Sequence, residues 1–210
     1  MKATSTMRIW RDTWRHAANL PADRRGLAAV EFAFILPVMM VMLFGTVEFS
    51  SAIAIDRKIT LMARTLSDLT SQALTVADSD LTNFFTASIA IMYPYTPTPT
   101  NAQISEIYVN ASKKATVQWS KAGTISSGAT QATLTTSTRS ATDDVTSLVP
   151  PSLLVANTYL ILSEVSYLYV PTVGYVLAKA GIKMGDSAFT RPRQSTCVYY
   201  PTAGTTCPTS

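Results

Sequence analysis

The chain of 210 residues has room for one membrane helix and one modest domain of about 130 to 150 residues, which excludes two full globular domains. The net charge of +4 does not indicate nucleic-acid binding, because six basic residues stand before the long apolar run: Lys2, Arg8, Arg11, Arg15, Arg24 and Arg25. The only histidine, His16, also precedes that run, which excludes a Ser-His-Asp triad and the usual zinc sites from the C-terminal part.

The sequence carries no glycine-rich phosphate loop, and no motif aligns its serines and lysines as a catalytic pair. We therefore expect a protein that is not an enzyme and that needs no cofactor or metal. We also expect neither nucleic acid nor a small-molecule substrate among its partners.

The first 25 residues form a basic leader. Trp10, Trp14 and His16 are spaced so that a short amphipathic helix would lie on the inner membrane face. The flank that follows the apolar run has fewer basic residues nearby, namely Arg57, Lys58 and Arg64. By the positive-inside rule this bias places the N-terminus in the cytoplasm and the C-terminal part outside.

The apolar run from Leu27 to Val47 has the length of about 20 residues that a helix needs to cross a bilayer. Glu31 is its only formal charge, and Pro37 is tolerable inside such a helix. One interpretation of Glu31 is a position in the headgroup zone; the other is a partner inside the membrane. Glu48, just beyond the run, either marks the outer interface or helps to set the depth of the helix.

The spacing between Gly26 and Glu31 favours a partner. If a peptidase cut after Gly26, Leu27 would become the new N-terminus and Glu31 the fifth residue of the mature chain. A new ammonium group would then lie one helical turn from a carboxylate. The cleavage site of this hypothesis is therefore Gly26 and Leu27.

A basic leader, a glycine, four apolar residues, a glutamate, an aromatic residue and a long apolar helix together resemble the class III signal of type IV prepilins. The amino-acid sequence from Gly26 to Pro37, followed by Phe44-Gly45-Thr46-Val47-Glu48-Phe49, is similar to the corresponding segment of the TadE/TadG-like minor pilins, or pseudopilins, of the tight-adherence (Flp) type IVc pilus system. Phe32 follows Glu31 where the major pilins of that system tend to carry tyrosine, and this difference indicates a minor component.

The resemblance implies a bacterial inner-membrane precursor that a prepilin peptidase cuts after Gly26. Glu31 would pair with the freed amine of a neighbouring subunit. The expected partners are that peptidase, other pilin subunits, inner-membrane pilus assembly proteins and the membrane, and the expected role is pilus assembly and surface adherence. The alternative is a scaffold protein that stays uncut in the membrane and carries a periplasmic binding domain. An ordinary secretory signal, cut near Ala52-Ile53-Ala54, is a further alternative.

Beyond the membrane the helix is predicted to continue as a stalk. Its apolar residues are spaced by three and four: Ile55, Ile59, Met62, Leu66, Leu69, Ala73 and Val76. Such a narrow seam packs either on the chain's own sheet or on a neighbouring subunit, and both are open here.

Asp78-Ser79-Asp80 offers an N-terminal cap for a second helix, which ends before Pro94. A proline-rich linker, 94–100, follows. Residues 104–109 and 115–120 then alternate as a β-hairpin, in which Val117 and Trp119 are the expected partners of Ile107 and Val109. The segment 123–144 is predicted to be a mobile loop that contributes little core. Within it, Asp143 and Asp144 are expected to be solvated rather than to bind a metal ion.

The strongest predicted strand is 159–170, followed by a short helix over 175–180 and an edge strand over 184–190. The fold class is therefore α+β: one long N-terminal transmembrane and stalk helix, then a small extracytoplasmic domain with an antiparallel sheet of about three to four strands. The predicted boundaries are 1–26 for the cytoplasmic leader, 27–50 for the transmembrane helix, 51–76 for the helical stalk and 77–210 for the extracytoplasmic domain.

Cys197 and Cys207 are the only cysteines, and both lie near the C-terminus. Two nearby cysteines in an extracytoplasmic segment predict a disulfide. Free thiols and a two-cysteine metal site are the alternatives, and the second lacks a downstream histidine.

Overall fold

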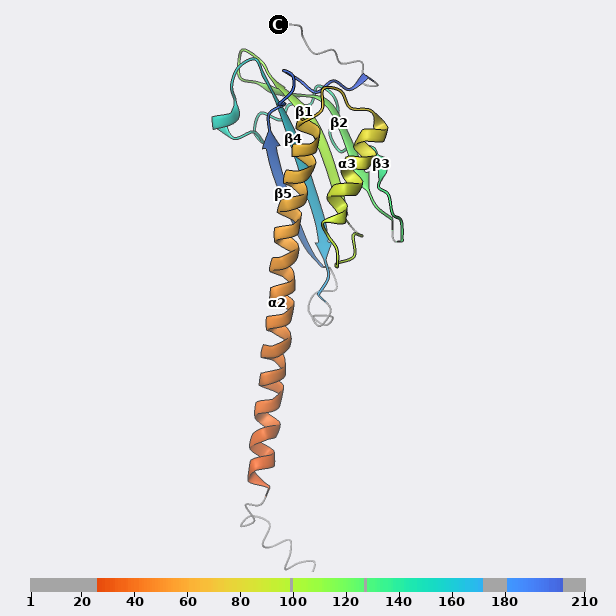
Figure 1. The fold of residues 1–210 in the computed structure, drawn as a ribbon. Helices are drawn as coiled ribbons and strands as arrows, with labels where there is room; N and C mark the ends of the chain where they lie inside the picture. The colour runs from red at the N-terminus through yellow and green to blue at the C-terminus, as the bar shows by residue number, and fades with distance from the viewer. Residues whose placement is uncertain (1–25, 99, 127, 172–180, 202–210) are drawn as a thin grey trace, which may run out of the picture. The chain divides into compact units, whose positions relative to one another are not determined.

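The computed structural model describes residues 26–98, 100–126, 128–171 and 181–201 (Figure 1). The elements in chain order are α2 (Leu27–Ser71), α3 (Asp78–Ala90), β1 (Thr100–Val109), β2 (Ala115–Thr124), β3 (Thr133–Thr135), the 3-10 turn η2 (Pro151–Leu153), β4 (Thr158–Tyr169) and β5 (Ile182–Thr190). The chain divides into two compact units, Met1–Val47 and Glu48–Ser210, and α2 contributes residues to both. We call the second unit the C-terminal domain.

The C-terminal domain is built on one antiparallel sheet with the order β3-β2-β1-β4-β5. The α+β class is therefore confirmed. The sheet has five strands, one more than the upper figure of the prediction, because β3 pairs with the end of β2 through Thr133 to Thr135. β4 lies between β1 and β5, and β5 is an edge strand, as the sequence predicted.

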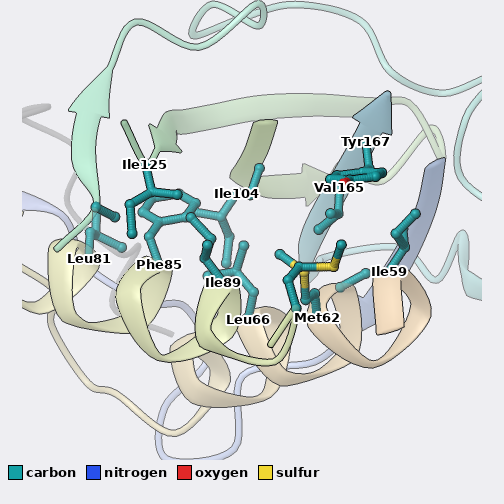
Figure 2. Packing of buried hydrophobic residues seen from close by; sticks show 14 of the residues in the cluster. Ile59, Met62, Leu66, Leu81, Phe85, Ile89, Ile104, Ile125, Val165 and Tyr167 are labelled. Atoms are coloured by element: carbon teal, nitrogen blue, oxygen red, sulfur yellow. The ribbon is translucent and has the colours of Figure 1, made fainter. Parts of the chain in front are cut away.

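The last part of α2 and all of α3 pack on one face of this sheet (Figure 1). Figure 2 shows the interface: side chains from both helices point toward the sheet. The labelled members are Ile59, Met62 and Leu66 from α2, Leu81, Phe85 and Ile89 from α3, and Ile104, Ile125, Val165 and Tyr167 from the sheet side. The predicted seam of α2 thus packs on the chain's own sheet.

The opposite face of the sheet, here called the open face, carries a second and smaller apolar cluster. Its members come from three strands and from the segment after β3: Ile107, Val109, Ala115, Val117, Val145, Val149, Leu160 and Leu162. A β-bulge between Glu106 and Ile107 shifts the register with β2, so that Ile107 pairs with Val117 while Glu106 pairs with Trp119. Trp119 therefore points to the helix-covered face, and its predicted place beside Val117 is wrong.

The ends of the two helices differ from the predicted ends for identifiable reasons. α2 ends at Ser71, because residues 74–76 leave the helix and bond to Tyr199 in an extended bridge. α3 begins after Ala77, which has no capping side chain; the Asp80 carboxylate instead accepts the Ala77 N–H at 2.9 Å.

The segment 123–144 contributes more than the prediction allowed. It contains β3, and Ile125 and Ala132 are buried against the main core. Asp143 and Asp144 accept hydrogen bonds from Ser140 and Thr146, so both carboxylates act in local turns. The leader before Gly26, the predicted helix 175–180 and Cys207 lie outside the described residues.

Candidate functional site

The predicted cleavage site is the first turn of α2. The Gly26 carbonyl accepts the Val30 N–H at 3.1 Å, which makes Gly26 the residue on which the helix begins. A Cβ atom built at Gly26 would meet no atom within 4 Å. The fold therefore gives no steric reason for glycine at this position.

Glu31 is the fifth residue of α2 and lies on the same helical face as Leu27, about 6 Å further along the axis. Its side chain is exposed and has no partner among the residues that the structure describes. The geometry thus places Gly26, Leu27 and Glu31 within one and a half turns. Nothing in the described part of the single chain neutralises the carboxylate.

The rest of the apolar segment presents large side chains on every face of the helix. Those from Phe32 to Val47 are exposed: Phe32, Phe34, Ile35, Leu36, Val38, Met39, Met40, Val41, Met42, Leu43, Phe44 and Val47. The Thr46 hydroxyl is satisfied by the Met42 carbonyl at 2.8 Å. Among the described residues, α2 is the one helix long and apolar enough to cross a membrane, as expected for a single-pass membrane protein.

Glu48 has a specific role that sequence reasoning missed. It is the first residue of the C-terminal domain, and it accepts a hydrogen bond from the hydroxyl of Tyr169 at the end of β4. Burial and the hydrogen bond to Glu48 raise the pKa of Tyr169 to about 12, so its hydroxyl stays a donor at neutral pH. No local pattern could reveal this contact, because 121 positions separate the two residues.

Glu106 holds the C-terminal segment on the sheet. Its carboxylate is fully buried on the helix-covered face and accepts the Val198 N–H at 2.5 Å, while the Trp119 indole donates to the Val198 carbonyl at 2.9 Å. Burial raises the pKa of Glu106 to about 7, although the Val198 amide and the Trp119 indole act to lower it. This site fixes the backbone next to Cys197.

Cys197 is buried and is not a free thiol. Its pairing with Cys207 stays a prediction, because Cys207 lies outside the described residues. The structure thus brings Cys197 to the edge of the main core, beside Val198 and Tyr200.

A polar groove of about 580 Å³ occupies the open face beside the second apolar cluster. Glu164 and Gln103 line this groove. Arg139 donates two hydrogen bonds of 2.6 and 2.5 Å to the Glu164 carboxylate, and Gln103 donates to the same carboxylate at 2.6 Å. Burial acts to raise the pKa of Glu164, but the hydrogen bonds from Arg139 and Gln103 outweigh it and lower that pKa. The Glu164 carboxylate is therefore engaged with Arg139 and Gln103, and no acidic or histidine cluster suited to a metal ion occurs in the described part.

Comparison with known families addresses the first part of this site. Residues 26–66 match the family model of the TadE-like proteins. This segment is TadE-like. The TadE-like match begins at Gly26, contains the whole apolar segment with Glu31, and ends inside the part of α2 that packs on the sheet. It confirms the resemblance seen in the sequence and associates the chain with the Tad pilus. No curated protein and no solved structure matches the chain.

Proposed function

We propose that the chain is the membrane-bound precursor of a minor pilin, or pseudopilin, of a Tad-type pilus. The observation that carries the proposal is the first turn of α2. There a glycine that the fold does not require precedes, by five positions, a carboxylate without a partner in the described part of the chain. The TadE-like match that starts at the same glycine supports this proposal.

The proposed processing step hydrolyses the peptide bond between Gly26 and Leu27. A prepilin peptidase supplies the catalytic groups, Gly26 leaves with the leader as a carboxylate, and Leu27 gains a free amine that is protonated at neutral pH. This ammonium stands at the N-terminus of α2, where the helix dipole adds further positive potential. The chain itself performs no catalysis and is the substrate of this reaction.

The proposed assembly step pairs this ammonium with Glu31 of a neighbouring subunit. An unpaired charge costs several kcal/mol in a medium of low dielectric constant, and an opposite charge offsets that cost. Because Leu27 and Glu31 are separated by about 6 Å along one helix, pairing between two chains fixes their axial offset. The exposed apolar side chains from Phe32 to Val47 then pack between neighbouring helices.

The proposed location is the bacterial inner membrane, with the leader in the cytoplasm and the C-terminal domain in the periplasm. The basic leader supports this orientation through the positive-inside rule. Other pilin subunits and assembly proteins of the inner membrane are the proposed partners, and incorporation into an extracellular pilus used for adherence is the proposed end state.

Processing is tested with Gly26→Val. We expect the unmodified chain to lose its first 26 residues when it is produced with an active prepilin peptidase, and Gly26→Val to stay intact; intact-mass spectrometry measures both. The matched control is Gly45→Val, since Gly45 lies in the same helix and a Cβ added there would also meet no atom within 4 Å. A wild-type chain that keeps Met1 in the presence of active peptidase contradicts the proposal and favours the uncut scaffold.

The pairing role is tested with Glu31→Ala and Glu31→Gln. Both variants are expected to insert into the membrane and to be cut, but to be missing from sheared pili, because neither offers a negative charge to the freed amine. Quantitative immunoblotting of the membrane and pilus fractions measures this. Wild-type amounts of either variant in pili would contradict charge pairing while leaving the processing step intact.

A further inference from the structure

One end of the C-terminal domain carries exposed apolar side chains that its own core does not use. Phe49 and Ile53 come from α2, Leu168 from the end of β4, Val170 from the position directly after β4, and Ile182 from the start of β5. Their exposed fractions are 68, 39, 38, 53 and 50 %, respectively. We call these five residues the strand-end patch.

Hydrogen bonds hold the parts of the strand-end patch at the same end of the domain. Tyr169, between Leu168 and Val170, donates its hydroxyl to Glu48, the residue before Phe49. Ile182 is the ladder partner of Tyr169, and Lys183 is that of Leu168. The patch therefore surrounds a tyrosine that is tied to the first residue of the domain.

The pattern along β4 shows that Leu168 does not serve the packing of the open face. Leu160 and Leu162 are buried in the second apolar cluster, and Glu164 and Ser166 line the polar groove. The apolar character returns only at Leu168, beyond the groove, where the side chain is partly exposed. Apolar side chains that gather on a surface without serving the core indicate a contact with something outside the domain.

We propose that the strand-end patch rests on the lipid bilayer and fixes the C-terminal domain against the membrane surface. Lipid is the expected contact of this patch, because Glu48, the first residue of the domain, directly follows Val47, the last residue of the apolar segment. An apolar patch that continues an apolar membrane segment lies at the boundary between acyl chains and headgroups. Lysine interacts with lipid phosphates at this boundary, as the exposed Lys183 would.

Val170→Trp tests the contact in the full-length chain, with one chain in each lipid nanodisc and with Trp10 and Trp14 replaced by phenylalanine. Buried Trp119 contributes a constant background to the fluorescence, and the tryptophan introduced by Val170→Trp adds to it. Lipids brominated on the acyl chain near the headgroup are expected to quench at least half of this added emission. The matched control is Val155→Trp, at an exposed position before the other end of β4. It is expected to show no quenching, because the 12 residues of β4 span roughly 36 Å.

Ile182→Trp is a second probe in the same background and should be quenched like Val170→Trp. The proposal would be overturned if brominated lipid quenched the emission of both probes no more than that of Val155→Trp. A probe signal that changes only when several chains share a disc would also overturn it and would assign the patch to contacts between subunits. Because one uncut chain per disc suffices, the result does not depend on cleavage after Gly26 or on pilus assembly.

Discussion

The two parts of α2 have the same backbone conformation but different surroundings. From Leu27 to Val47 the large apolar side chains are exposed on every face, and the segment has no core of its own. From Ile55 to Ser71 only one seam is buried, and charged residues such as Arg57, Arg64 and Asp68 occupy the other faces. An apolar side chain in the first part needs lipid or a neighbouring subunit around it, whereas in the second part it needs a specific place in the core.

The largest expected effect comes from removing a core aromatic ring. Phe85 is fully buried between α3 and the sheet, so Phe85→Ala should lower the free energy of unfolding of the C-terminal domain by about 3 to 5 kcal/mol. Thermal unfolding in detergent, followed by the fluorescence of Trp119, measures the loss as a fall in Tm of about 10 °C.

The same substitution in the apolar segment provides the control. Phe34 is 75 % exposed, so Phe34→Ala should leave the Tm of the C-terminal domain unchanged. Gly123→Ala sharpens the test, because its Cβ would stand 2.5 Å from the Phe85 ring. That variant should be destabilised by about 2 kcal/mol, and the loss should disappear when it is combined with Phe85→Ala. Additive losses in the double variant would refute the predicted packing.

The next largest effect is expected from an added charge, to which the first part of α2 should be more sensitive than the second part. Met39→Arg puts a charge in the middle of the apolar segment, where it should raise the free energy of membrane insertion by about 3 kcal/mol. Leu61→Arg places the same side chain on an exposed face of the second part of α2 and should change stability by less than about 0.5 kcal/mol. Carbonate extraction of membranes measures insertion; equal recovery of both variants would contradict the division of α2.

A third prediction contrasts Glu106, which is buried in the core, with Glu31 in the apolar segment. Burial holds the pKa of Glu106 at about 7, so between pH 4.5 and 7 the folded state binds a proton that the unfolded state has released. The free energy of unfolding should therefore fall as the pH rises through this window, by at most about 3 kcal/mol.

Glu106→Gln keeps an oxygen that accepts the Val198 N–H but cannot ionise. Its Tm should be higher than that of the wild type at pH 8 and should vary less between pH 5 and 8. Glu31→Gln is the control, since Glu31 lies outside the C-terminal domain and should leave the pH dependence of that domain unchanged. An unaltered pH profile for Glu106→Gln would contradict the assigned pKa.

The sequence predicted those features that depend on local patterns. The apolar segment, the seam from Ile55 to Leu66 and the hairpin of β1 and β2 follow from composition and from periods of 3.6 and 2. The side of the sheet on which Trp119 lies did not follow, because one bulge residue reverses the alternation of a strand. β3 was missed because its three residues, Thr-Leu-Thr, are too few to show a period.

The contacts of Glu48 and Glu106 could not be predicted from the sequence for another reason. Glu48 meets Tyr169 and Glu106 meets Val198 only after the sheet has formed, and about 90 or more positions separate the members of each pair. By contrast, the TadE-like character of the segment that contains Gly26 and Glu31 was recognisable, because the pattern that carries it is local. A pattern of neighbouring residues can be recognised in a single sequence, whereas the partners of a buried carboxylate depend on how the strands are arranged in the sheet.

The hydrogen bond between the Gly26 carbonyl and the Val30 N–H has a consequence for the proposed cleavage after Gly26. This carbonyl belongs to the bond between Gly26 and Leu27, and a hydrolase attacks such a carbon only when the backbone around it is extended and accessible. The first turn of α2 must therefore fray before it can enter a catalytic cleft. Under the proposed function, the rate of cleavage depends on how often the helix end opens. Substitutions at Ala28 or Ala29 that stiffen or loosen that turn are then expected to change this rate without altering Gly26 or Leu27.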